Sequence, residues 1–194
     1  VLARLAAERR DGKIIELANK GIVELRLSVA KEIDASHNQL REVKIDECFK
    51  VDLSFNWITS ATLTNIVFLN LSHNPLRSFV VPKTVKDLNI SRCQLEVLSF
   101  LPGSLLETLD CSRNSLKTLS LPSRLLELNA RNNNLERIEE IGWRIKKMML
   151  KNNFLQQLPE LPEEIELNIE YNLFESFPLE PSGRILRDHN PLTL

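Results

Sequence analysis

The sequence has little cysteine, no excess charge of either sign and no long apolar run. Three cysteines are spread over 194 residues without clustering at either end, which argues against a disulfide-closed scaffold and predicts a reducing compartment. The net charge of −1 gives no general attraction for nucleic acid, which binds strongly basic surfaces. No stretch reaches the roughly 18 apolar residues of a membrane-spanning helix. No signal peptide is visible, although the chain does not begin with Met.

Patterns that would carry catalysis or bind metal are also scarce. The histidines His37, His73 and His189 are far apart in the chain, and no Cys or His cluster has zinc-ligand spacing. We expect Asp34 and Asp52 to lie about 5 Å apart in neighbouring strands. No nucleophile or further acid accompanies this carboxylate pair. The sequence therefore predicts no enzyme, no metal and no cofactor.

The feature that dominates the chain is an apolar ladder that ends in Asn, clearest at Ile66, Leu69, Leu71 and Asn74. With the Asn counted as position nine, it recurs at intervals of 18 to 21 residues, at Lys20, Asn38, Asn56, Asn74, Cys93, Asn114, Asn133, Asn153, Asn172 and Asn190. This spacing resembles the leucine-rich-repeat superfamily. The resemblance implies an α/β-type, right-handed horseshoe solenoid of about ten coils, with a parallel β-sheet on the concave face.

The coils are too short to carry a regular helix on the convex side. About eleven residues form each strand and its turn, which leaves too few for two helical turns and their connections. All prolines fall outside positions one to nine. We therefore expect convex segments that are extended or polyproline-like, with short 3₁₀ turns.

The two ends of the chain lead to further expectations. Leu2, Leu5 and Ala6 share one helical face, which predicts a helical cap over residues 1–12. The last coil has no polar cap, although repeat arrays normally need one. We expect residues 1–194 to be a single solenoid domain cut from a longer multidomain protein.

Two local motifs resemble different branches of the superfamily. Leu155, Leu158-Pro159 and Leu161-Pro162 look like the L-x-x-L-P-x-L-P signature of bacterial effector repeats, which by that resemblance bind host proteins and sometimes carry a separate ubiquitin-ligase domain. Residues 11–22 look like the opening coil of intracellular eukaryotic proteins, such as Ras-pathway scaffolds and PH-domain leucine-rich-repeat phosphatases. Because the doubled proline occurs only once, we favour the second resemblance. It implies a cytoplasmic, intracellular protein.

Two glycosylation sequons, Asn70-Leu-Ser72 and Asn89-Ile-Ser91, point instead to an extracellular protein. The repeat itself generates such a triplet whenever Asn precedes the second Leu and Ser follows it. We interpret both sequons as products of the repeat. An extracellular receptor fragment stays an alternative, and it predicts sugar on Asn70 or Asn89.

Positions two, three, five, seven and eight are expected to face solvent on the concave side. There Phe49, Phe55 and Phe68 have no inward role, and exposed aromatic rings are enriched at interfaces. Arg92 and Arg113 begin a basic zone that suits an acidic or phosphorylated segment. Position five is acidic or amide-bearing in most coils. The predicted partner-binding residues are Asp34, Phe49, Asp52, Phe55, Phe68, His73, Arg92, Arg113, Arg131 and Lys151.

The leading hypothesis is a non-catalytic protein-interaction module that binds a partner protein on its concave face. The alternative is a targeting or substrate-recognition domain of a larger signalling enzyme. In that case a phosphatase or ubiquitin-ligase domain would lie outside residues 1–194. A nucleic-acid role is the least favoured.

Overall fold

The computed structural model describes residues 3–7, 10–176 and 183–191. These residues contain strands and no helix. The strands are β1 (Ala3–Ala7), β2 (Arg10–Glu16), β3 (Ile22–Asp34), β4 (Glu42–Asp52), β5 (Ser60–Asn70), β6 (Ser78–Val81), β7 (Asp87–Asn89), β8 (Val97–Phe100), β9 (Thr108–Asp110), β10 (Thr118–Leu119), β11 (Glu127–Asn129), β12 (Arg137–Ile138), β13 (Lys147–Met149), β14 (Glu166–Asn168) and β15 (Ile185–Leu186).

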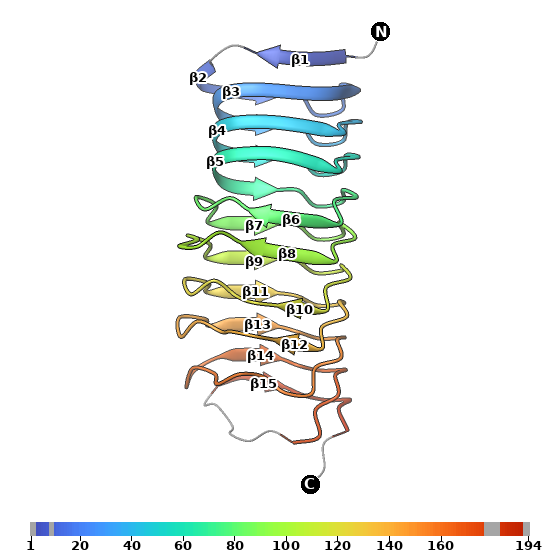
Figure 1. The fold of residues 1–194 in the computed structure, drawn as a ribbon, viewed down its shortest axis with the longest axis vertical. Helices are drawn as coiled ribbons and strands as arrows, with labels where there is room; N and C mark the ends of the chain where they lie inside the picture. Colours follow the sequence, from blue (N-terminus) through green and yellow to red (C-terminus); the bar gives the residue numbers. More distant parts are fainter. Residues whose placement is uncertain (1–2, 8–9, 177–182, 192–194) are drawn as a thin grey trace.

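The coils stack into an elongated column with strands along two of its faces (Figure 1). The long strands β3, β4 and β5 contribute to both faces: β1 pairs with the first half of β3, and β2 with its second half. The second halves continue into β7, β9, β11, β13, β14 and β15, and we call this the main sheet. The first halves, followed by the pairs β6–β8 and β10–β12, form what we call the outer face.

All neighbouring strands are parallel, and each repeat position lies beside the same position of the next coil. On the main sheet Asp34 pairs with Asp52, and Asp52 with Asn70. The same column continues through Asn89 to Asp110. Residues at the same repeat position thus pair between neighbouring coils, which confirms the positions assigned from the sequence.

The core consists of the inward ladder residues, and the position-nine asparagines connect the coils at one corner. Asn114 is buried, and its Nδ2 donates to the carbonyls of Ile90 and Cys111, both at 2.9 Å. Its Oδ1 accepts from the N–H groups of Cys93 (2.8 Å) and Leu95 (3.0 Å). One side chain thus satisfies backbone groups of two coils that the turning chain leaves unpaired.

Cys93 replaces Asn in this ladder, and the surrounding backbone compensates. Its Sγ donates to the Leu71 carbonyl at 3.1 Å, but the Leu76 N–H donates to carbonyls of Asn74 (3.0 Å) and Cys93 (3.1 Å) instead of to a ladder amide. Cys48, Cys93 and Cys111 are all buried free thiols.

Proline accompanies the first shortening of the outer strands along the chain. No proline precedes Pro75, and the outer sides of the early coils form the first halves of strands of 11 to 13 residues. Beyond Pro75 the outer strands have only two to four residues, with β6 lying between Pro75 and Pro82. Proline cannot donate to a ladder, so it limits strand length. The predicted extended outer segments are confirmed, but no 3₁₀ turn occurs in the described part of the chain.

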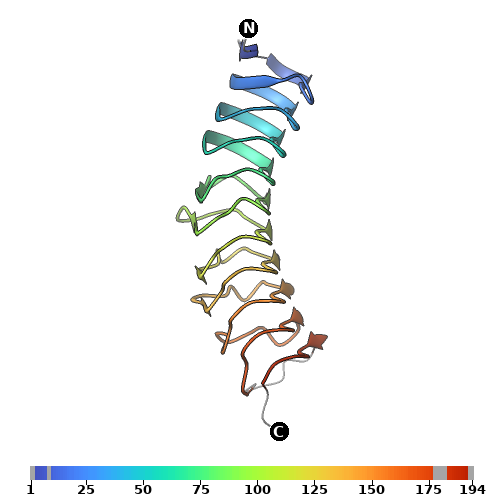
Figure 2. The same ribbon diagram turned by 90° about the vertical axis from the view of Figure 1, so that its right-hand side faces the viewer.

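The predicted horseshoe is a gently curved column in the structure (Figure 2). A solenoid bends strongly when its two sides have different rises per coil. Here β-strands follow one another on both sides as far as β12, at a similar spacing of about 4.8 Å per coil. The two faces are therefore nearly equal in length, and the curvature stays small.

The predicted N-terminal helix is wrong for the described residues of that segment. Ala3–Ala7 form β1, which pairs in parallel with β3 from Ile22 to Leu27. Gly12, with a φ of 71°, lies in β2, where the register against β3 shifts. The open edge of β3 offers backbone partners, and this pairing outweighs a short helical periodicity. Leu2 lies outside the described residues.

Candidate interaction surface

Position five is a column of structural hydrogen bonds as well as a polar stripe. Asp52 Oδ1 accepts from the Ser54 N–H (2.9 Å) and Oγ–H (2.6 Å), and its Oδ2 accepts from Asn70 Nδ2 at 3.1 Å. Asp34 accepts in the same way from Ser36. These carboxylates fix the turn after each strand. Two of the predicted binding residues, Asp34 and Asp52, therefore have a structural role.

The two sequons occupy the same structural place as these Asp-x-Ser triplets. Asn70 Oδ1 accepts from the Ser72 N–H at 3.1 Å, and Asn89 Oδ1 accepts from the N–H and Oγ–H of Ser91. Asn70 Nδ2, the atom that would carry a glycan, donates to Asp52. The interpretation of the sequons as products of the repeat thus has a physical basis.

Position eight is a column of residues in the left-handed backbone region, which we call the corner column. Each described N–H at this corner follows one pattern: the Phe55 N–H, for example, donates to the Ser72 carbonyl of the next coil at 3.0 Å. This geometry requires a φ between 54° and 60° in all ten coils, at Asn19, His37, Phe55, His73, Arg92, Arg113, Asn132, Asn152, Tyr171 and His189. The sequence placed these residues in one column but did not reveal their backbone conformation.

The aromatic residues form two groups where the sequence predicts one patch. Phe55 is stacked between His37 and His73, with ring centroids 4.4 and 4.0 Å apart. Phe49 packs edge-on against Phe68 at 5.0 Å. Phe68 and His73 are five residues apart in one coil, which is about 16 Å along an extended strand. The position-five stripe lies between the two groups, so Phe49 and Phe68 do not extend the corner stack.

The lower end of the corner column carries a second ring stack. Tyr171 and His189 lie 4.1 Å apart, and Lys151 Nζ lies 4.9 Å from the centroid of the Tyr171 ring. Lys151 also pairs with Glu170 at 3.3 Å. The amide of Asn168, and then Lys151, hold the pKa of Glu170 below its usual range. Lys151 is therefore neutralised by its own chain.

Between the two stacks lies a row of arginines without acidic partners among the described residues. Arg92 and Arg113 are exposed in the corner column, and Arg131 lies at position seven of the next coil. No ion pair joins any of the three to a carboxylate of the described chain, whereas Lys86, Lys147 and Lys151 are each paired. We call Arg92, Arg113 and Arg131 the arginine row.

Two buried polar atoms beside or within this row lack hydrogen-bond partners. They are Arg131 Nε and His73 Nδ1. Burial, then the charge of Arg92 and of His37, lower the pKa of His73, so this ring stays neutral at neutral pH. Unsatisfied buried polar groups are rare in folded proteins. Here they border the part of the surface that carries unbalanced positive charge.

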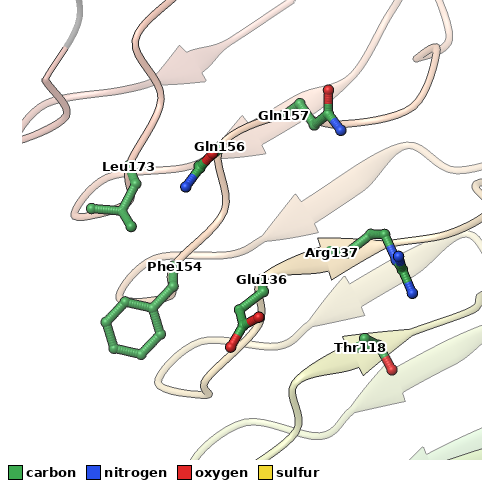
Figure 3. A pocket seen from close by; sticks show the side chains of 7 residues that line it. All are labelled: Thr118, Glu136, Arg137, Phe154, Gln156, Gln157 and Leu173. Carbon is green, nitrogen blue, oxygen red and sulfur yellow. The ribbon is translucent and has the colours of Figure 1, made fainter.

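A shallow hollow of about 580 Å³ lies beyond the ladder asparagines, toward the outer face, with its side chains spread along several coils (Figure 3). Phe154 and Leu173 give it an apolar side, and Arg137 within it is paired with Glu139 at 2.9 Å. It contains none of the predicted partner-binding residues. The lining residues are Thr118, Glu136, Arg137, Phe154, Gln156, Gln157 and Leu173.

Neither a metal-binding cluster nor a membrane-spanning helix occurs in the described residues. No group of three or more His, Cys, Asp or Glu side chains there is placed to hold a metal ion. Within the same ranges, no helix is long and apolar enough to cross a membrane.

Comparison with known proteins gives relatives but no matching protein-family model. Osteomodulin of Bos taurus is 30% identical over 168 residues, covering 76% of this chain and 37% of that protein. Osteomodulins of Rattus norvegicus and Mus musculus are also 30% identical, and the similarity covers 77% of this chain and 37% of each of those proteins. The chain thus spans less than half the length of these relatives. Among solved structures, YopM from Yersinia enterocolitica WA-314 is similar with a TM-score of 0.43 and 22% sequence identity. The similarity covers 87% of this chain and 52% of that one.

The family follows from these observations together. The coils repeat every 18 to 21 residues, their strands are parallel and in register, and a buried asparagine ladder joins them. With the relationship to osteomodulin, these features show that the chain belongs to the leucine-rich-repeat superfamily.

Proposed function

We propose that this chain is a non-catalytic protein-interaction module that binds an acidic segment of a partner protein along the corner column. The observation that carries the proposal is the arginine row, which has no acidic partner in the described chain and is bounded by ring stacks on both sides. Repeat solenoids generally bind their partners on extended surfaces formed by many coils.

The chemistry of the arginine row favours a carboxylate-rich ligand. A guanidinium group binds a carboxylate through two parallel hydrogen bonds, and such charge-assisted bonds are among the strongest in proteins. Arg92 and Arg113 lie in neighbouring coils, about 4.8 Å apart along the column. An extended acidic segment running along the column would contact several arginines at once.

The backbone of the corner column gives a second reason. Apart from Gly, Asn is the residue that best tolerates the left-handed region, and three coils use it there, whereas Phe is strained in that conformation. Phe55 is nevertheless 44% exposed in this position. Strain at an exposed aromatic residue supports a role in binding.

The proposal is tested by reversing charge in the arginine row. We expect Arg92→Glu/Arg113→Glu to abolish binding of a fluorescent glutamate-rich peptide, measured by anisotropy, and to remove the partner proteins that the unaltered chain captures. The matched control is Arg124→Glu/Arg144→Glu, which changes two exposed arginines outside the main sheet and the corner column. Equal binding by the first variant and the unaltered chain would contradict the proposal. If a phosphorylated peptide binds and the glutamate-rich peptide does not, the ligand of the arginine row is a phosphorylated segment and not a carboxylate-rich one.

We further propose that the protein works in a reducing, cytoplasmic compartment. Three buried free thiols and the structural use of both sequon asparagines support this. Expression in a secretory host provides the test. A glycan on Asn70 or Asn89, detected by intact mass, would contradict it.

A further inference from the structure

The outer face carries two columns of outward side chains, at positions thirteen and fifteen of the coils. Figure 1 looks onto the strands that carry them. The thirteen column is Glu24, Glu42, Ser60, Ser78, Val97, Thr118 and Arg137, and the fifteen column is Arg26, Lys44, Thr62, Val80, Ser99, Ser120 and Glu139. Their alignment follows from the strand registers within β3–β5, β6–β8 and β10–β12 and from the repeat.

The middle of both columns has no charge. From β5 to β10 every member of the two columns is a hydroxyl-bearing residue or valine. Val80 and Val97 lie at the centre and are 56% and 58% exposed. Both are β-branched residues on neighbouring strands, so they form an exposed apolar spot on a regular sheet. We call Ser60, Thr62, Ser78, Val80, Val97, Ser99, Thr118 and Ser120 the uncharged window.

Charged residues of both signs border the uncharged window, and their order reverses from one border to the other. On β4 the thirteen column carries Glu42 and the fifteen column Lys44, whereas on β12 Arg137 and Glu139 occupy these columns. Read along the chain, β4 has an acidic and then a basic residue in the two columns, and β12 has a basic and then an acidic one. This arrangement is complementary to itself.

We propose that the outer face binds a second copy of this chain, with a two-fold axis that runs parallel to the strands between β6 and β8. Such an axis keeps each column opposite itself and reverses the order of the coils. It places β6 opposite β8 of the other copy, β5 opposite β10, and β4 opposite β12. Glu42 then faces Arg137, and Lys44 faces Glu139, twice in each dimer.

A second copy fits this face better than an unrelated partner for two reasons. The rise per coil is identical in both copies, so the columns stay aligned over many coils when two sheets pack at about 10 Å. The interface would also have an uncharged centre and a charged rim, as stable interfaces do, and it would be isologous, as a two-fold requires.

The existing ion pairs at the border do not oppose docking. Arg137 pairs with Glu139 at 2.9 Å and Lys44 with Asp46 at 3.8 Å, both within one coil. Their side chains are about half exposed or more. Exposed pairs of this kind have small energies, so they can exchange for pairs between copies.

The test is sedimentation velocity of the chain over a wide concentration range. We expect a monomer–dimer equilibrium, and we expect Val97→Lys to remove the dimer by placing a charge in the uncharged window. Lys44→Glu alone puts two acids opposite each other at two symmetric places, and Glu139→Lys alone does the same with two bases. Each should weaken dimerisation on the order of tenfold. The double variant Lys44→Glu/Glu139→Lys should recover most of the loss.

The rescue by the double variant separates a specific interface from a change in fold, and circular dichroism of each variant provides the folding control. A monomer at every concentration would overturn the proposal, as would a dimer that is insensitive to Val97→Lys. A double variant no better than the single variants would also overturn the proposed axis. Arg92→Glu/Arg113→Glu should leave the dimer unchanged, because the corner column lies outside the outer face.

Discussion

Replacing Asn114 by Ala tests how the asparagine ladder holds the coils together. The variant removes an acceptor from the buried N–H groups of Cys93 and Leu95 and a donor from three carbonyls. An unsatisfied buried donor costs about 1–3 kcal/mol. Two orphaned N–H groups therefore predict a loss of about 2–6 kcal/mol, even where water hydrates the carbonyls.

The matched control at the same ladder position is Cys93→Ala. Among the described residues the Cys93 side chain accepts no hydrogen bond, and its Sγ donates at 3.1 and 3.4 Å. Its loss should cost about 1 kcal/mol. Urea unfolding followed by circular dichroism compares the two variants, and hydrogen exchange of the Cys93 and Leu95 amides shows whether the opening is local. If Asn114→Ala is no less stable than Cys93→Ala, the hydrogen bonds of the ladder do not hold the coils together.

Three further outcomes are expected. Burial raises the pKa of the Cys93 thiol to about 11, so the folded state favours the protonated thiol. The stability that Cys93 contributes is full below the ordinary thiol pKa and is lost as pH rises through about 11. Unfolding curves at increasing pH will show this loss. Burial first, and then Arg92, lower the pKa of His73. The stability that His73 contributes is therefore present above the ordinary histidine pKa and is lost as pH falls through the lowered pKa. NMR titration should place the His73 midpoint below 6.5, and Arg92→Ala should raise that midpoint. Gly142→Ala would bring its Cβ within 2.6 Å of the Ser123 carbonyl oxygen and should cost about 1–3 kcal/mol, and an unchanged denaturation midpoint would contradict this.

The sequence alone determined the coil length, the inward residues and the register. These features repeat locally, and each coil packs only on its neighbours, so a linear pattern contains nearly all the information for the stack. It also placed the histidines, Phe55 and two arginines in one column. The same spacing put Cys93 and Asn114 at position nine, and the structure shows all three cysteines buried.

Only the tertiary structure decided what these columns do. The left-handed backbone at position eight arises from hydrogen bonds between coils, which no single coil contains. The division of the phenylalanines into two groups depends on distance along a strand and on which rings meet. The strand at Ala3–Ala7 forms because the edge of β3 needs backbone partners, a requirement that helical periodicity in residues 1–10 cannot reveal. That the arginine row has no acidic partner among the described residues likewise depends on where their carboxylates lie in the folded chain.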